Sequence, residues 1–423
     1  MDQHRWVCVT AVLGCATVSA LGDESPPATV QGAPGDDAEL RAYVKRLEDR
    51  VTELERDRGD DLRRSLDGLQ QSSGSALADA VKSIEFSGFV EMLYSHNLRP
   101  GGAVPGRRGD TIGFNQFRGP DADADTFSFQ TVQIRAERAL GDVGSTGFKV
   151  RADYGRLAEI ADADPVFDGG TASNAFDVRE AYFVWRAPFA PLDHVDFMAG
   201  KFRSLCGFET LENDENWLVT RNPIAVFGTP ATHTGIGATA PLGEKVTAMV
   251  HLVNGWDDVT DANDSKTAMA HLTFGRFEDP LESQFSVRAS YGGTTGGRQG
   301  DHQRFLEFVW DGKLAEETEA GFDVIDGESD GRSWRGAALY VRQSLGEKTK
   351  LAARVGRYSD DALGPQRVRL CDVSLALWHE LATGVTAGVE FRHDWSGDDV
   401  FLDGDGDPIG SQDTLTLSLL YRF

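Results

Sequence analysis

The chain has 423 residues, of which 42 are Lys or Arg and 67 are Asp or Glu, and its formal net charge is −25. This charge argues against nucleic acid as a partner, because binding to phosphates requires clustered Lys and Arg. No run of about 18 apolar residues is present, which excludes a helical membrane span. A membrane β-barrel fits the composition, because its strands alternate apolar and polar residues.

Residues 1–20 are predicted to be an export signal. The apolar core Trp6–Leu13 follows Arg5, and small residues precede a cleavage site after Ala20. The alternative is a lipoprotein signal in which Cys15 is acylated. Both signals take the mature chain out of the cytoplasm.

The next segments are predicted to lie in the periplasm. Residues 21–37 are rich in Pro, Gly and acid and form a flexible lead-in, residues 38–71 form a helix, and residues 72–83 form a linker. Five apolar residues of the helix have coiled-coil spacing: Leu40, Val44, Leu47, Val51 and Leu54. Because so short a seam is unstable alone, it predicts a homo-oligomer. A trimer is expected and a dimer stays open; the alternative is one amphipathic helix lying on its own chain.

Residues 84–423 are predicted to form an all-β transmembrane barrel of about sixteen antiparallel strands. Leu415, Leu417 and Leu419 alternate with polar residues, which gives a strand with one apolar face. One strand is predicted at 146–160. Long and short links alternate along the chain, and 326–332 is predicted to be one of the external links. Long external loops and short periplasmic turns are typical of outer-membrane barrels, and an even strand number returns the chain to its starting side.

Aromatic residues are expected to form two girdles at the bilayer interfaces. The residues assigned to the periplasmic girdle are Trp185, Trp310, Tyr421 and Phe423, and those assigned to the external girdle are Tyr94, Trp256, Tyr291 and Trp395. Tyr421 and Phe423 also belong to the closing strand and are interpreted as the insertion signal.

One segment carries a family resemblance. Thr229 to Ala238 contains the run Pro-Ala-Thr-His-Thr-Gly, and it leads to Val253-Asn254-Gly255-Trp256-Asp257. This hairpin resembles the OmpL-like β-barrel porin family, and Phe86 to Ser95 resembles the first strand of that family. Ala231 departs from the phenylalanine expected there. The resemblance covers about residues 86–423 and implies a passive pore without catalytic residues.

Charged residues of the polar strand phase are candidates for the pore lining. Ten basic and ten acidic residues share this phase, so no one-signed ladder for phosphate is expected. His233 is interpreted as a pore-lining or loop-anchoring residue rather than a catalytic one. The candidate pore-lining residues are Glu91, Arg135, Arg151, Asp153, Glu180, His233, Arg288, Arg354, Glu390 and Arg392.

The external links are acidic, with 25 Asp+Glu and 8 Lys+Arg, and are expected to form a negative vestibule. The candidate vestibule residues are Asp257, Asp258, Asp261, Asp264, Asp403, Asp405 and Asp407. The run from Asp403 to Asp407 begins like a calcium loop, but the glycine and glutamate of an EF-hand are missing. No metal site is therefore assigned.

These features predict an outer-membrane porin of a Gram-negative cell. Small hydrophilic solutes or ions would diffuse through it, with a moderate preference for cations, no cofactor and no enzymatic step. Its expected partners are outer-membrane lipid and further copies of itself. The alternative is a surface protein in which the barrel is an anchor and the acidic loops bind a partner or a divalent cation.

Overall fold

The computed structural model describes residues 42, 44–54, 56, 82–99, 114–161, 175–261, 264–275, 282–293, 302–364 and 366–423. The chain forms two units, Met1–Ala78 and Asp79–Phe423. In the first unit, residues 42, 44–54 and 56 are helical. No helix among the described residues is long and apolar enough to span a bilayer. The export signal, the lead-in and most of the linker lie outside the described residues.

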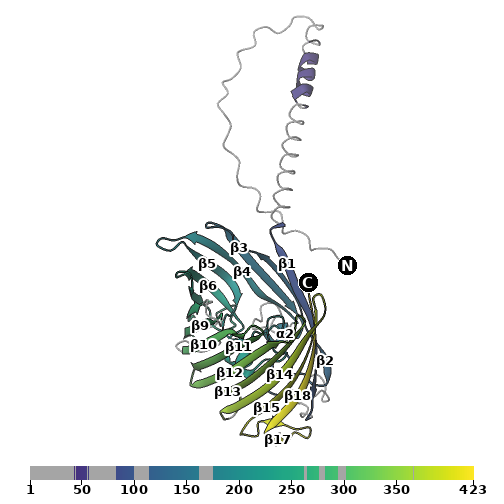
Figure 1. Cartoon of the computed structure of the whole chain (residues 1–423). Coiled ribbons are helices and arrows are strands. Elements are labelled where there is room, and N and C mark those ends of the chain that lie inside the picture. The colour runs from purple at the N-terminus through teal and green to yellow at the C-terminus, as the bar shows by residue number, and fades with distance from the viewer. Residues whose placement is uncertain are drawn as a thin grey trace. The chain divides into compact units, whose positions relative to one another are not determined.

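The second unit is a closed antiparallel barrel of sixteen strands, β1 to β15 and β18, as predicted (Figure 1). Its wall strands are β1 Glu85–Asn97, β2 Thr126–Arg138, β3 Thr146–Tyr154, β4 Phe176–Pro188, β5 His194–Arg203, β6 Thr232–Pro241, β7 Val246–Val253, β8 Thr267–Phe274, β9 Gln284–Gly293, β10 His302–Ala315, β11 Thr318–Ser329, β12 Arg332–Ser344, β13 Thr349–Asp360, β14 Val368–Ala382, β15 Val385–Trp395 and β18 Ser411–Arg422. The links contain α2 Arg156–Ala161, the π-helix η1 Ile224–Gly228, and the small hairpin β16 Phe401–Leu402 and β17 Pro408–Ile409.

The wall is apolar outside and polar inside. In β18 the leucines Leu415, Leu417 and Leu419 are 39–52% exposed, whereas Thr414 and Thr416 are fully buried. A water-soluble domain would bury the leucines and expose the threonines. This inverted distribution is the one that a barrel in lipid requires.

The two ends of the barrel differ in their links. At the short-turn end, links such as 316–317 and 383–384 are tight; at the long-loop end, links such as 204–231 and 396–410 are long. The predicted external link at 326–332 is wrong. β11 continues to Ser329, and only Asp330 and Gly331 connect it to β12, both with positive φ (48° and 77°). Such a residue pair makes the two-residue turn that suits the twist of a hairpin.

The strand predicted at 146–160 is also too long. β3 ends at Tyr154, and Gly155 has a φ of 130° that side-chain-bearing residues rarely adopt. A Cβ at this position would lie 2.7 Å from the carbonyl oxygen of Gln130. The chain therefore leaves the wall at Gly155 and forms α2, where Leu157 is buried.

Candidate functional site

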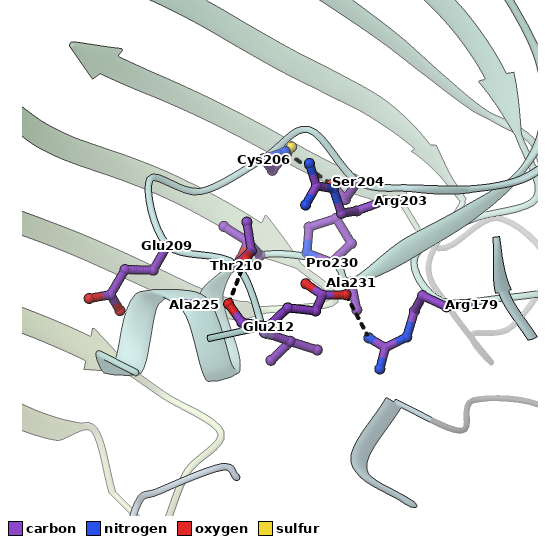
Figure 2. Close-up of a pocket in the computed structure, with 12 residues that line it drawn as sticks. Arg179, Arg203, Ser204, Cys206, Glu209, Thr210, Glu212, Ala225, Pro230 and Ala231 are labelled. Atoms are coloured by element: carbon purple, nitrogen blue, oxygen red, sulfur yellow. Dashed lines mark hydrogen bonds and ion pairs between the residues drawn. The ribbon is translucent and has the colours of Figure 1, made fainter. Parts of the chain in front are cut away.

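Residues 204–231, which connect β5 to β6 and are called the internal loop below, fold into the barrel. Leu218 to Asn222 are at most 2% exposed, although links between strands usually lie in water. Figure 2 shows residues of the loop that line a cavity. The cavity has a volume of about 20 Å³, which is room for one water molecule. Arg179, Glu209 and Glu212 are among the residues that line it. Burial raises the pKa of the neighbouring Cys206 thiol to about 12, so this thiol is protonated at neutral pH.

An apolar cluster joins one side of the internal loop to the wall. Cys206, Leu218 and Ile224 of the loop share this cluster with wall residues of β5, β7, β8 and β10 to β14. The wall residues include Phe202, Val253, Met269, Phe305, Ile325, Trp334, Tyr340 and Tyr358. Burying apolar side chains contributes about 25 cal/mol per Å² of surface. The loop is therefore seated by a hydrophobic core inside the barrel.

Two glycines of the wall make room for the internal loop to pack against β11 and β12. A Cβ on Gly336 would lie 2.5 Å from Ile224, and one on Gly321 would lie 2.3 Å from the ring of Phe208. Phe208 stacks on Tyr340 with 4.2 Å between the ring centroids. Any side chain at these two positions would push the internal loop away from β11 and β12.

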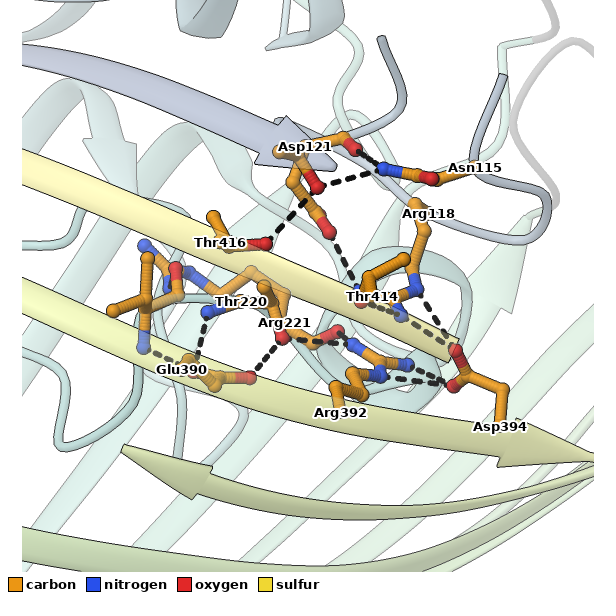
Figure 3. Close-up of polar contacts among 12 residues, drawn as sticks. Asn115, Arg118, Asp121, Thr220, Arg221, Glu390, Arg392, Asp394, Thr414 and Thr416 are labelled. Carbon is orange, nitrogen blue, oxygen red and sulfur yellow. Dashed lines mark hydrogen bonds and ion pairs between the residues drawn. The ribbon is translucent and has the colours of Figure 1, made fainter. Parts of the chain in front are cut away.

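The middle of the internal loop is held by charged residues of β13 and β15, and Figure 3 shows Glu390 of β15 beside Thr220 of the loop. The carboxylate of Glu390 accepts the N–H groups of Val219 at 2.6 Å and Thr220 at 3.0 Å, and also the hydroxyl of Thr220. Arg354 donates to the Thr220 carbonyl at 2.8 Å and to Glu209 at 2.7 Å. Hydrogen bonds to charged groups contribute about 1.5–3 kcal/mol each. We refer to Glu390 and Arg354 as the loop clamp.

A second anchor lies at the start of the internal loop. Glu307 of β10 accepts the N–H of Gly207 at 2.7 Å, and Asp323 of β11 accepts the N–H of Phe208 at 3.1 Å. Arg288 of β9 pairs with Glu307 at 2.7 Å. Buried carboxylates thus hold backbone groups of the loop that would otherwise lack partners.

The internal loop also contacts the opposite side of the barrel. Asp214 pairs with Arg135 of β2 at 2.6 Å, and its carbonyl accepts a bond from Arg422 of β18 at 2.9 Å. Glu212 pairs with Arg151 of β3 at 3.1 Å. Burial disfavours the Glu212 charge, but Arg179, Arg151 and other cations outweigh burial and lower its pKa to about 2. The loop therefore spans the lumen from β9–β15 to β18 and β2–β3.

A second link folds onto the wall beside the clamp. Arg118, in the link between β1 and β2, pairs with Asp121 at 2.6 Å and with Asp394 of β15 at 2.5 Å, and all three are buried (Figure 3). Asp394 also pairs with Arg392 at 2.7 Å. These contacts fix the link at the long-loop end, where it narrows the interior further.

The ten candidate pore-lining residues all lie on the inner side of the wall. Arg135 and Arg288 keep 19% and 14% of their side chains exposed. The other eight are buried: Glu91, Arg151, Asp153, Glu180, His233, Arg354, Glu390 and Arg392. Several of the ten hold the internal loop or pair with neighbouring strands. His233 donates its Nδ1–H to the carbonyl oxygen of Gly255 at 2.9 Å, which anchors the link after β7.

The candidate vestibule residues differ in environment. Asp257 accepts the N–H groups of Ala231 and Thr232, and burial raises its pKa. Asp258 and Asp261 are half-buried, and Asp261 pairs with Lys266. Asp403 accepts the N–H groups of residues in its own turn, Asp405 and Asp407. Asp264, Asp405 and Asp407 are exposed.

The contact residues of the internal loop were missed by the sequence analysis. Glu209, Glu212 and Thr220 lie in the link between β5 and β6, in which the sequence analysis predicted no site residue. The length of this link and its buried Leu218 and Ile224 are the signals that could have indicated a fold into the lumen. Trp256 was wrongly assigned to a girdle: it packs inside the barrel against Phe305 and Trp334.

Partly exposed charges of both signs remain inside the barrel near the short-turn end. Lys149 lies 3.6 Å from Glu137, and Arg342 pairs with Glu319 at 2.6 Å. At the long-loop end, where the internal loop begins, Arg203 of β5 pairs with Glu215 of this loop at 2.5 Å. Among the described residues, no group of three or more His, Cys, Asp or Glu could hold a metal ion. The interior thus offers water-compatible surface with alternating charge.

An antiparallel barrel with an apolar outside, a charged interior and a loop folded across the lumen defines a β-barrel porin. The family model of beta-barrel porin-2, OmpL-like, matches residues 83–423. The chain belongs to this family, which makes it a β-barrel of the outer membrane, as the sequence resemblance implied.

Solved structures share the fold at low sequence identity. The outer membrane channel DcaP of Acinetobacter baumannii is 12% identical with a TM-score of 0.53, over 80% of this chain and 97% of that one. The anion-selective porin from Comamonas acidovorans is 11% identical with a TM-score of 0.53, over 80% and 99%. The trimer form of OmpT of Vibrio cholerae is 11% identical with a TM-score of 0.52, over 80% and 99%. No curated protein matches the chain.

Proposed function

We propose that this protein is a passive pore through which small hydrophilic solutes and ions diffuse, and that the internal loop sets the size of the passage. The observation that carries the proposal is the attachment of this loop to both sides of the lumen, by the loop clamp and by the pairing of Asp214 with Arg135. A fixed loop across a barrel narrows it without any moving part. The alternative, a barrel that only anchors binding loops, predicts no conductance, so single-channel recording of the purified protein in planar bilayers separates the two.

The pore is proposed to prefer cations moderately at low salt. Asp264, Asp405 and Asp407 are exposed at the long-loop end, which we assign to the cell exterior. A negative mouth raises the local cation concentration, and the paired charges inside add no strong opposing barrier. Salt shortens the reach of the field from about 30 Å at 0.01 M to about 3 Å at 1 M. The preference should therefore fade as salt increases.

Replacing Asp264, Asp405 and Asp407 with asparagine is expected to lower the cation preference at low salt and to leave conductance at 1 M KCl nearly unchanged. The reversal potential under a potassium chloride gradient measures the effect. A control variant neutralises Asp193, Glu316 and Glu317, which are exposed acids in turns of the short-turn end. It should change the preference less. An anion-selective sign in the unmodified protein would show that the interior, rather than the mouth, sets selectivity.

The N-terminal helix is proposed to join copies of the chain in the periplasm, as a trimer. Val44, Leu47, Val51 and Leu54 are each 45–53% exposed within one chain, so the seam offers its apolar side to a partner helix. Deletion of residues 38–71 should weaken the oligomer but leave a folded barrel, because the deletion removes no wall strand. Native gels report the oligomer, and heat-modifiable mobility reports the barrel. An unchanged oligomer would contradict this role of the helix.

A further inference from the structure

Three arginines lie close together on the outer surface of the wall, toward the long-loop end. Arg335 of β12, Arg357 of β13 and Arg369 of β14 are exposed and belong to adjacent strands (Figure 1). In the sheet register, Arg357 is opposite Ala337 of β12, two residues from Arg335. It is also opposite Cys371 of β14, two residues from Arg369. Such diagonal neighbours are about 7–8 Å apart, within reach of long side chains. We call these three residues the outer arginine triad.

Two members of the triad have acidic partners. Arg335 pairs with Asp326 at 2.6 Å, and Arg369 pairs with Asp398 at 3.3 Å. No described residue forms a hydrogen bond or an ion pair with Arg357. A guanidinium beside lipid has a high free-energy cost unless an anion accepts its N–H groups. The triad therefore has one positive charge more than these two acids neutralise.

An apolar groove extends from Arg357 toward the short-turn end of the wall. It has a volume of about 340 Å³ and lies over β11 to β15. Arg357 lines it together with its small neighbours Ala337 and Cys371. The lining residues in the next row toward the short-turn end are Phe322, Leu339 and Val355. The groove thus places apolar surface next to an unpaired positive charge, on the face of the wall that contacts lipid.

A lipid with a phosphate group has both features in the same order. Arginine binds phosphate through paired N–H donors, and basic sites on membrane proteins bind lipid head groups. The apolar surface beside the arginine gains free energy when an acyl chain covers it. The triad lies toward the long-loop end, which we assign to the cell exterior, so this lipid belongs to the outer leaflet.

We infer that the outer arginine triad binds the phosphate of a phosphorylated lipid of the outer leaflet, and that the groove holds one of its acyl chains. The unpaired charge of Arg357 and the groove that begins at this residue support this choice of ligand. The site goes beyond passive diffusion through the pore. It lies on the opposite face of the wall from the loop clamp, so lipid binding and conductance can be measured separately.

The first test measures lipid binding to the full-length protein in detergent. Native mass spectrometry with added diphosphorylated lipid A detects the bound lipid, and heat-modifiable mobility verifies folding. Arg357→Gln should weaken binding about tenfold, because it removes charged hydrogen bonds to phosphate. Arg304→Gln is the matched control, because Arg304 is an exposed arginine of β10 that pairs with Glu328 and does not line the groove. It should bind as the unmodified protein does. Absence of binding to the unmodified protein, or equal affinity of the two variants, would overturn the inference.

The second test separates the phosphate from the acyl chain. Ala337→Trp fills the groove, and Ala353→Trp is the control at an outward position of β13 that does not line it. The ligands are lipid A with and without its phosphates, and inorganic phosphate. Only phosphorylated lipid A should bind tightly, and only Ala337→Trp should weaken it. Equal binding of dephosphorylated lipid A would disprove the role of the triad. Equal binding of inorganic phosphate, or unchanged binding by Ala337→Trp, would disprove the role of the groove.

Discussion

Replacing Glu390 with alanine is expected to raise single-channel conductance severalfold and to admit larger sugars. The substitution leaves the N–H groups of Val219 and Thr220 without their acceptor inside the barrel. It also removes a negative charge near Arg354, which keeps its ion pairs with Glu209 and Asp372. Each lost hydrogen bond to a charged acceptor weakens the attachment of the internal loop to the wall by about 1.5–3 kcal/mol. The middle of the internal loop should then leave the wall of β13–β15.

The measurements are conductance in planar bilayers and swelling of liposomes in sugars of increasing size. Asp196→Ala is the matched control, because Asp196 pairs with Arg186 at 2.8 Å between two wall strands and at a distance from the clamp. It removes one interior carboxylate and should change conductance little. A correctly folded Glu390→Ala protein with unmodified conductance and sugar cut-off would disprove the role of the clamp.

Deleting residues 420–423 is expected to abolish insertion into the outer membrane while export continues. The backbone of Phe423 exchanges two hydrogen bonds of 3.0 Å with Gly88. Leu420 to Arg422 pair with β1, and Leu420 and Tyr421 also pair with β15. Truncation would leave backbone groups of both neighbours unpaired in lipid, at several kcal/mol for each group.

Cell fractionation and heat-modifiable mobility measure this effect. The matched control removes residues 403–406, four exposed or half-exposed residues of the small hairpin in the last link. This deletion leaves every wall strand intact and should permit insertion. If the truncated protein gave as much heat-modifiable barrel as the unmodified protein, barrel closure would not depend on the last four residues.

The strands were predictable because the bilayer imposes one simple rule on each of them. Alternation in segments such as Leu415 to Leu419 places each side chain in lipid or in the lumen, whatever the rest of the chain does. The errors occurred where single residues end that rule. Gly155 turns the chain out of β3, and Asp330-Gly331 shorten a predicted link to a two-residue turn.

The candidate site was predictable only in part. Strand parity placed Arg354 and Glu390 on the inner side, because parity is local. Their burial depends on Thr220 and Glu209, which belong to a link whose path is set by apolar contacts with distant strands. No periodicity within residues 204–231 encodes that path. The sequence pattern could therefore predict which wall residues face the lumen, but it could not predict which of them are exposed to water and which are covered by the internal loop.

The loop clamp joins parts of the chain that are far apart in sequence. Thr220 and Glu390 are separated by 170 residues, and Gly207 and Glu307 by 100. The internal loop can be anchored at its start once β10 is in place, but its middle has no acceptor until β15 has joined the wall. If the strands join the wall in chain order, the lumen stays wide until β15 is in place, and narrowing the passage is among the final steps of folding.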